Sequence, residues 1–238
     1  QGGLSWRRGV MAMKILVVNP NTTASMTAKI ATAARAVARP DTEIVAANSQ
    51  SGPASIQGFL DIATCVPGLL DEVRNHPDVD AIVVACFDDT GLDAVRCIAS
   101  VPVLGIGEAA YHAASMIAAK FSVVTTMSRS VPGLENNLAR YGLAQKCVRV
   151  RATDIPVLKL EEGDPKTLDK IRQEIRNAIE HDHAEAIVLG CAGMADLMAH
   201  LSDEFGLPVI DGVAAGVALA EALVNSGLKT SKIGAYSA

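Results

Sequence analysis

The sequence is poor in aromatic residues and has no excess of positive charge. Its 238 residues include four Phe, three Tyr and one Trp, and 21 Lys and Arg stand against 26 Asp and Glu, a net charge of −5. A nucleic-acid groove needs a basic surface, and single strands are held by stacking on aromatic rings. We therefore expect no nucleic-acid partner, and a core built from Ala, Val, Ile and Leu.

Long hydrophobic runs are also missing. The most apolar late stretch, 212–220, is bounded by Asp211 and Glu221, far short of the ~20 residues that a membrane span needs. The opening QGGLSWRRGV leads into MAMKILVVN, which is typical of a strand and not of a signal-peptide core. We expect no membrane association and a cytoplasmic location, with residues 1–12 an extension that precedes the start of the folded chain.

Cysteine and histidine do not form the patterns of a disulfide framework or a zinc site. The five Cys are odd in number and include no CxxC pair, and the five His are scattered. Such a set in a long chain without a secretory signal predicts neither disulfides nor a metal centre. The default interpretation of each Cys is a small buried hydrophobe.

The residues that are present alternate between short apolar runs and amphipathic stretches. Continuous apolar runs predict strands buried on both faces, and alternating strands and helices predict an α/β fold with parallel sheets. Strands are predicted at 14–18, 43–47, 81–85, 103–106, 121–125, 148–150, 186–190 and 207–210. Helices are predicted at 22–38, 61–75, 91–99, 108–119, 132–141, 165–181, 194–203 and 213–226.

The chain also repeats itself at an offset of about 105 residues. Three pairs of segments recur in the same order: KILVVN at 14–19 with FSVVTT at 121–126, AIVVAC at 81–86 with AIVLGC at 186–191, and VPVLGIGEAA with LPVIDGVAA. Internal duplication predicts two pseudo-twofold-related, Rossmann-like lobes with the active site in the cleft between them. We assign 13–106 plus 213–238 to lobe 1 and 107–212 to lobe 2.

Each half of the repeat places a cysteine, Cys86 or Cys191, at the carboxyl end of an apolar strand. Functional residues gather at this edge of parallel sheets. Backbone N–H groups and a helix dipole there are expected to lower a thiol pKa. Two thiols on opposite faces of a carbon can invert it, one removing a proton and the other returning one. The scheme requires no metal or organic cofactor.

A buried Cys is more often structural than catalytic, but equivalent positions in a repeat reverse that expectation for Cys86 and Cys191. Cys65, Cys97 and Cys147 have no repeat partner, so we interpret them as structural. The developing enolate oxygen needs fixed donors. Backbone N–H groups after the two cysteines are the candidates, because Gly193 permits close approach.

Five segments together resemble the hydantoin racemases of the Asp/Glu racemase superfamily: NPNTTASMT, ACFDDTGLDAVR, FSVVTTMSRSVP, VLGCAGM and LPVIDGVAAGV. The resemblance covers almost the whole chain from Met13. It implies a two-lobed α/β fold, a cofactor-independent two-base mechanism, a catalytic pair at Cys86 and Cys191, and homo-oligomerisation. It also implies a hydantoin or related ureide ring as the small-molecule substrate, and allantoin racemases share the same motifs.

The substrate-binding candidates follow the strands of both halves: Asn19, Asn21, Phe87, Thr125, Thr126, Ala192 and Gly193. The Asn and Thr side chains can hydrogen-bond ring carbonyls, although they serve equally well as turns and caps. Phe87 can pack on the ring or belong to the core. Many relatives carry Gly-Asp-Pro where this chain has Asp88-Asp89-Thr90. That departure leaves the substrate choice open, and at least one of the two aspartates is expected in a solvated turn.

The leading function is therefore racemisation of 5-monosubstituted hydantoins. Allantoin racemisation is the nearest alternative. Aspartate or glutamate racemisation is more distant, since the strand-end motifs contain no cation except Arg129. A ligand-binding or redox-sensing module with two responsive thiols is the non-enzymatic alternative.

Overall fold

The computed structural model describes residues 12–162 and 164–237, in which strands and helices alternate. All eight predicted strands and all eight predicted helices are present, with ends shifted by a few residues. The strands are β1 (Met13–Asn19), β2 (Thr42–Asn48), β3 (Ala81–Val84), β4 (Val103–Gly105), β5 (Phe121–Thr125), β6 (Cys147–Ala152), β7 (Ala186–Gly190) and β8 (Val209–Asp211). The predicted α/β class is confirmed.

The helices fill the connections between successive strands, as parallel pairing requires. They are α1 (Ala24–Val37), α2 (Phe59–Arg74), α3 (Leu92–Ile98), α4 (Ile106–Ile117), α5 (Val131–Arg140), α6 (Pro165–Asp182), α7 (Met198–Phe205) and α8 (Gly212–Asn225). Three short 3₁₀ turns precede α5, α6 and α7: η1 (Ser128–Ser130), η2 (Val157–Glu162) and η3 (Ala192–Leu197). Asp164 caps α6, accepting the N–H of Lys166, and Pro165 is its first residue, the arrangement expected for a helix start.

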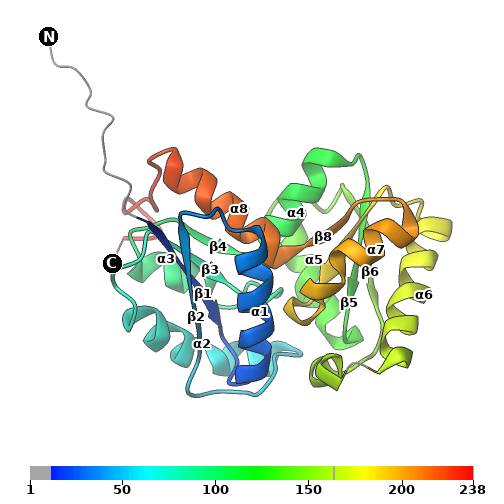
Figure 1. Ribbon diagram of the computed structural model, residues 1–238, viewed down its shortest axis with the longest axis horizontal. Helices are drawn as coiled ribbons and strands as arrows, with labels where there is room; N and C mark the ends of the chain where they lie inside the picture. Colours follow the sequence, from blue (N-terminus) through cyan, green and yellow to red (C-terminus); the bar gives the residue numbers. More distant parts are fainter. Residues whose placement is uncertain (1–11, 163, 238) are drawn as a thin grey trace, which may run out of the picture.

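The two halves form two parallel sheets of the same topology. The strand order is β2-β1-β3-β4 in the first sheet and β6-β5-β7-β8 in the second, and Figure 1 shows them as separate lobes. Residues 15–18 of β1 and 186–189 of β7 are fully buried, because helices cover both faces of each sheet. The repeat in the sequence is therefore a repeat in the fold.

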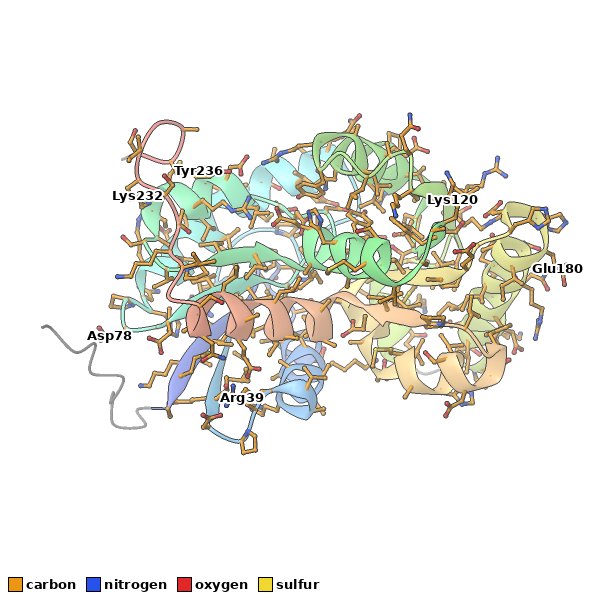
Figure 2. The ribbon with its side chains drawn as sticks, turned by 90° about the horizontal axis from the view of Figure 1, so that it is seen from above. Arg39, Asp78, Lys120, Glu180, Lys232 and Tyr236 are labelled. Atoms are coloured by element: carbon orange, nitrogen blue, oxygen red, sulfur yellow. The ribbon has the colours of Figure 1, made fainter. Side chains whose placement is uncertain are left out.

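The helices α4 and α8 connect the two lobes. The helix α8 follows the last strand of the second sheet but contacts β3 and β4 of the first, while α4 follows the first sheet and contacts β7 and β8. The two helices lie side by side across the middle of the molecule (Figure 2). This exchange places α8 against the first sheet and α4 against the second. We therefore propose 13–106 plus 213–238 as lobe 1 and 107–212 as lobe 2.

Most of the predicted extension, residues 1–12, lies outside the described residues. Within the described range, no helix has both the length and the apolar character that crossing a membrane requires.

Candidate active site

A pocket lies where the carboxyl ends of the two sheets meet, and both lobes line it. Its walls come from the ends of β5 and β7, from the segments after β1, β3, β5 and β7, and from the connections after β2 and β6. They comprise Asn21, Met26, Ile56, Ala85, Cys86, Phe87, Asp88, Thr125, Thr126, Ser130, Val157, Gly190, Cys191 and Ala192. The two cysteines that the repeat singled out therefore face a common cavity.

Cys86 is partly buried in a tight turn that follows β3. Its carbonyl accepts the N–H of Asp89 at 3.0 Å, which closes the turn. The hydroxyl of Thr90 lies 3.8 Å from the Cys86 Sγ, within donating distance of sulfur. The turn thus surrounds the thiol with its own polar side chains.

Burial raises the pKa of the Cys86 thiol well above its usual value, and the negative charge of Asp88 raises it further. The backbone N–H of Asp88 and the Thr90 hydroxyl oppose the shift. The expectation that the strand end lowers this pKa is therefore wrong for Cys86. The next helix, α3, begins only at Leu92, too far for its dipole to offset desolvation.

Cys191 occupies the matching position directly after β7. Its carbonyl accepts the N–H of Met194 at 3.0 Å, so the turn is closed by the same three-residue step as the Cys86 turn. Cys191 is buried, with 9% of its surface exposed, and it precedes η3. The residues that follow it, Ala192 to Met194, are buried and uncharged.

The strand-end Asn and Thr candidates are buried at the pocket, except that Asn19 stands behind it. Asn21, Thr125 and Thr126 are lining residues. Asn19 is not among them: its amide donates to the Asn21 side chain at 2.9 Å and to Thr27 at 3.0 Å, so it holds Asn21 in place.

Two of these side chains also hold the backbone around the pocket. The side-chain oxygen of Asn21 accepts a hydrogen bond from the backbone N–H of Thr23 at 2.9 Å, just before α1 begins. Thr125 donates to the Gly190 carbonyl at 2.9 Å, joining β5 to β7 immediately before Cys191.

Phe87, Ala192 and Gly193 differ in how they relate to the cavity. Phe87 and Ala192 line it, and Phe87 also packs edge-on against Tyr111, with ring centroids 5.2 Å apart. It therefore serves both core and pocket. Gly193 is not a lining residue. A Cβ there would lie 3.0 Å from Leu160 and 3.7 Å from the Cys191 Sγ, so the glycine permits close packing behind the thiol.

The structure also adds lining residues that the sequence analysis did not select. Met26, Ile56, Ala85, Ser130, Val157 and Gly190 are largely apolar. Ile56 and Val157 come from irregular connections, where no strand-end signal points to a site. The sequence offers a signal for Asp88, because many relatives have glycine at this position, the first residue of their Gly-Asp-Pro tripeptide. It lines the pocket, and burial, assisted by the charge of Asp61, raises its pKa to about 7.

Of the two aspartates, at least one of which is expected in a solvated turn, Asp89 is not the solvated one. Its side chain is buried, with 6% of the residue exposed, and points away from solvent into a set of backbone and hydroxyl donors. Burial raises its pKa to about 7 in spite of those hydrogen bonds, which lower it.

The chain matches the family model described as Asp/Glu/Hydantoin racemase over residues 15–220. It is 49% identical over 227 residues to a hydantoin racemase of Rhizobium meliloti, covering 94% of each chain. It is 46% identical over 226 residues to a hydantoin racemase of Pseudomonas sp. strain NS671, covering 94% of this chain and 91% of that one. The structure of allantoin racemase from Klebsiella pneumoniae superposes with a TM-score of 0.92 at 45% identity, covering 94% and 93% of the two chains.

Proposed function

The chain belongs to the Asp/Glu/hydantoin racemase family and is an isomerase of the racemase class, and from this premise we propose that it racemises 5-monosubstituted hydantoins through Cys86 and Cys191. The observation that carries the proposal is the pair of matched turns. Two cysteines, each within two residues of the end of a central strand and each in the same three-residue turn, line one pocket from two related sheets.

In the proposed reaction, one cysteine acts as thiolate and removes the proton from C5 of the ring. The electron pair of the broken C–H bond moves into the adjacent carbonyl and gives an enolate. The other cysteine, as thiol, donates its proton to the opposite face of C5, which restores the carbonyl and inverts the centre. The protonation states of the two sulfurs are then exchanged, and the mirror-image substrate runs the same steps in reverse.

The raised pKa of Cys86 fits the proton-donor half of this pair. Burial and the Asp88 charge favour its thiol form, which is the form that must deliver a proton. Removal of a proton from C5 by Cys86 then requires that substrate binding stabilise its thiolate, which the nearby Thr90 hydroxyl and the Asp88 N–H assist. The enzyme would use no cofactor in this scheme.

The remaining predicted residues are assigned to substrate binding. Asn21, Thr125 and Thr126 offer side-chain hydrogen bonds to ring carbonyls and N–H groups, with Asn19 holding Asn21. Backbone N–H groups at Ala192 and Gly193 are proposed donors to the enolate oxygen. Phe87 packs on the ring or on its 5-substituent. We also propose a cytoplasmic homo-oligomer, in line with the family resemblance.

The cavity measures about 30 Å³, enough for about one or two water molecules and too small for a substituted ring. We therefore expect substrate binding to widen the cleft. The segments that carry Ile56 and Val157, a connection between β2 and α2 and the start of η2, are the parts of the wall best suited to move, because neither belongs to a sheet.

Allantoin, which is a 5-ureidohydantoin, is the second candidate substrate. It is favoured by the similarity to allantoin racemase at 45% identity and by Asp88, whose carboxylate can accept hydrogen bonds from a ureido group. Aspartate and glutamate fit less well, since the pocket wall within the described residues contains no Lys or Arg to bind a carboxylate.

The test incubates enantiopure 5-benzylhydantoin, 5-isobutylhydantoin and allantoin with the protein in deuterium oxide, followed by polarimetry and NMR and corrected for the uncatalysed rate. We expect racemisation with one deuterium at C5. Cys86→Ser or Cys191→Ser should each lower the rate by about 10²–10⁴-fold, while Cys97→Ser, outside the pocket, should leave it unchanged. Full activity in either of the first two variants would refute the two-thiol proposal.

A further inference from the structure

The Cys86 turn ends in Asp89, a buried residue that does not line the pocket. Its backbone has a φ of 52°, a left-handed conformation that aspartate adopts more readily than most residues. The carboxylate leaves the turn on the side away from the cavity and reaches two other elements. Both elements are distant in sequence from Cys86.

The first element is the start of α4. The Asp89 Oδ1 accepts the N–H of Gly107 at 2.9 Å, and Oδ2 accepts the N–H of Glu108 at 2.7 Å. These N–H groups have no partner within the helix, and a carboxylate is the favoured acceptor at a helix start. Asp89 thus caps α4 from a turn 18 residues earlier.

Asp89 and Phe87 approach the backbone at the start of α4 so closely that residues 105 and 107 must be glycine. A Cβ at Gly105 would lie 2.0 Å from the Asp89 Oδ1, and one at Gly107 would lie 2.4 Å from the Phe87 carbonyl oxygen. Distances below 3.0 Å are not tolerated by real Cβ atoms. Residues 86–89 are therefore pressed directly onto the backbone at the junction of β4 and α4.

The second element belongs to the other lobe. The Tyr141 hydroxyl, immediately after α5, donates to the Asp89 Oδ2 at 2.7 Å. One turn earlier in α5, the Asn137 amide donates to the backbone carbonyl of Asp88 at 2.8 Å. Since α5 packs against β6 of the second sheet, these bonds tie the Cys86 turn of one lobe to the helix of the other.

The second lobe has no matching connection among its described residues. Met194 stands where the repeat places the counterpart of Asp89, and it is a buried apolar residue. The helix after β8 is capped instead by Asp211, which accepts the N–H of Ala214 at 2.8 Å. The carboxylate cap of α8 therefore comes from the strand that precedes it, and that of α4 from the cysteine turn.

We propose that Asp89 and Tyr141 are positioning residues that fix the Cys86 turn against α4 and α5 and so hold the Cys86 sulfur at its working distance from C5. The role rests on the proposed two-thiol function. Neither side chain lines the pocket; both act through Cys86. An error of about 1 Å in such a placement costs about 10²-fold in rate, so a loosened turn should affect Cys86 chemistry well before it affects Cys191.

The experiment isolates the two half-reactions. Cys191→Ser leaves Cys86 as the only thiol base, and Cys86→Ser leaves Cys191, so each protein is expected to exchange the C5 proton of one enantiomer with deuterium oxide. Asp89→Asn and Tyr141→Phe are then introduced into both backgrounds. The asparagine amide keeps one acceptor oxygen but turns its NH2 group toward the other helix N–H, and phenylalanine deletes the hydrogen bond from Tyr141 while that from Asn137 remains.

We expect Cys86-dependent exchange to fall about 10–100-fold with Asp89→Asn and about tenfold with Tyr141→Phe, while Cys191-dependent exchange changes less than about twofold. Two matched variants control for stability. Tyr236→Phe deletes another tyrosine–aspartate hydrogen bond, to Asp93 at 3.0 Å, from a tyrosine that itself lies at the far end of lobe 1 (Figure 2). Asp211→Asn alters the cap of α8. Neither control should single out Cys86.

An equal loss in both backgrounds would reduce Asp89 and Tyr141 to ordinary stabilising residues, and no loss in either would contradict their role outright. If Asp89→Asn does not fold, Tyr141→Phe decides alone. Failure of the two-thiol function is seen separately, before these variants are made: neither single-cysteine protein exchanges, or one racemises at full rate. That outcome overturns the positioning role as well.

Discussion

The turns that carry Cys86 and Cys191 have the same backbone and different surroundings. Each follows the third strand of its half, and each is closed by a hydrogen bond from the third following residue to the cysteine carbonyl. After Cys191 come uncharged, buried residues. After Cys86 and Phe87 come two aspartates and a threonine, and of these the charge of Asp88 and the hydroxyl of Thr90 act on the thiol. The two halves of the repeat place the sulfur atoms in the same way, but the side chains that follow each cysteine differ in charge.

On the proposed two-thiol mechanism, this difference means that the two bases need not be equal. The two enantiomers of a hydantoin with one stereocentre have the same free energy, so kcat/KM must be equal in both directions whatever the asymmetry of the site. The asymmetry can appear only in kcat and KM taken singly and in the pH dependence of each thiol. The predictions below test where it arises, beginning with the largest expected effect.

The first prediction tests the close packing behind the Cys86 turn by adding a side-chain atom to it. In Gly107→Ala, the added Cβ would meet the Phe87 carbonyl oxygen at 2.4 Å and the Asp89 carboxylate at 2.7 Å. We expect a loss of about 1–3 kcal/mol in the free energy of unfolding, measured by urea denaturation, and slower Cys86-dependent exchange.

Gly133→Ala in α5 is the matched control. Its Cβ finds only Phe59 at 3.8 Å, and alanine is favoured over glycine in helices by up to about 1 kcal/mol. This variant should be at least as stable as the unaltered protein. Equal stability of the two alanine variants would contradict the close packing at Gly107.

The second prediction concerns stability against pH. Burial raises the pKa of both Asp88 and Asp89 to about 7, so between about pH 4 and pH 7 the folded protein binds more protons at these sites than the unfolded chain. Their contribution to the free energy of unfolding is therefore present below pH 4 and is lost as the pH rises through 7. Asp88→Asn should flatten this decline in urea titrations. Asp71→Asn, at an exposed residue paired with Arg74, should leave the decline unchanged; a steeper decline in Asp88→Asn would contradict the assignment.

The third prediction separates the two thiols by charge. Because the negative Asp88 raises the pKa of Cys86, Asp88→Asn should lower the pH midpoint of Cys86 alkylation by about one pH unit. Alkylation of each cysteine is followed by mass spectrometry of its own peptide. The midpoint for Cys191 should move less, and an equal shift at both thiols would show that Asp88 acts on the cleft as a whole.

The smallest predicted effect is that of the Thr90 hydroxyl. Thr90→Val keeps the buried shape but removes the donor 3.8 Å from the Cys86 Sγ. The thiolate loses a weak hydrogen bond, so the alkylation midpoint of Cys86 should rise by about 0.3–0.7 pH unit, the equivalent of about 0.5–1 kcal/mol. A fall in that midpoint would mean that the hydroxyl instead stabilises the thiol.

The sequence is sufficient to predict the strands, the helices and the placement of two cysteines at one pocket, because these depend on short-range patterns; the catalytic role of the pair stays a proposal. Continuous apolar runs mark strands buried on both faces, and the repeat aligns Cys86 with Cys191 without any knowledge of the pocket. The family resemblance adds the substrate class that we propose. Asn21, Thr125 and Thr126 were also found by their places at strand ends.

Other features depend on contacts between distant segments and were not predictable in this way. Asp89 reads as a turn residue, and only the arrival of α4 and Tyr141 makes it buried. Ile56 and Val157 both line the pocket, but they come from connections between strands and helices, and hydrophobic periodicity does not predict the course of such connections. The pKa of Cys86 was predicted in the wrong direction, because helix distance and burial are properties of the folded chain.

The central claim is that Cys86 and Cys191 act on opposite faces of the same carbon. The most direct measurement gives each enantiomer of 5-benzylhydantoin separately to Cys86→Ser and to Cys191→Ser in deuterium oxide, and follows C5 by NMR. The account predicts that each variant exchanges the C5 proton of one enantiomer, that the two variants choose opposite enantiomers, and that neither racemises at an appreciable rate. Exchange of the same enantiomer by both variants, or racemisation by either at the rate of the unaltered protein, would contradict it.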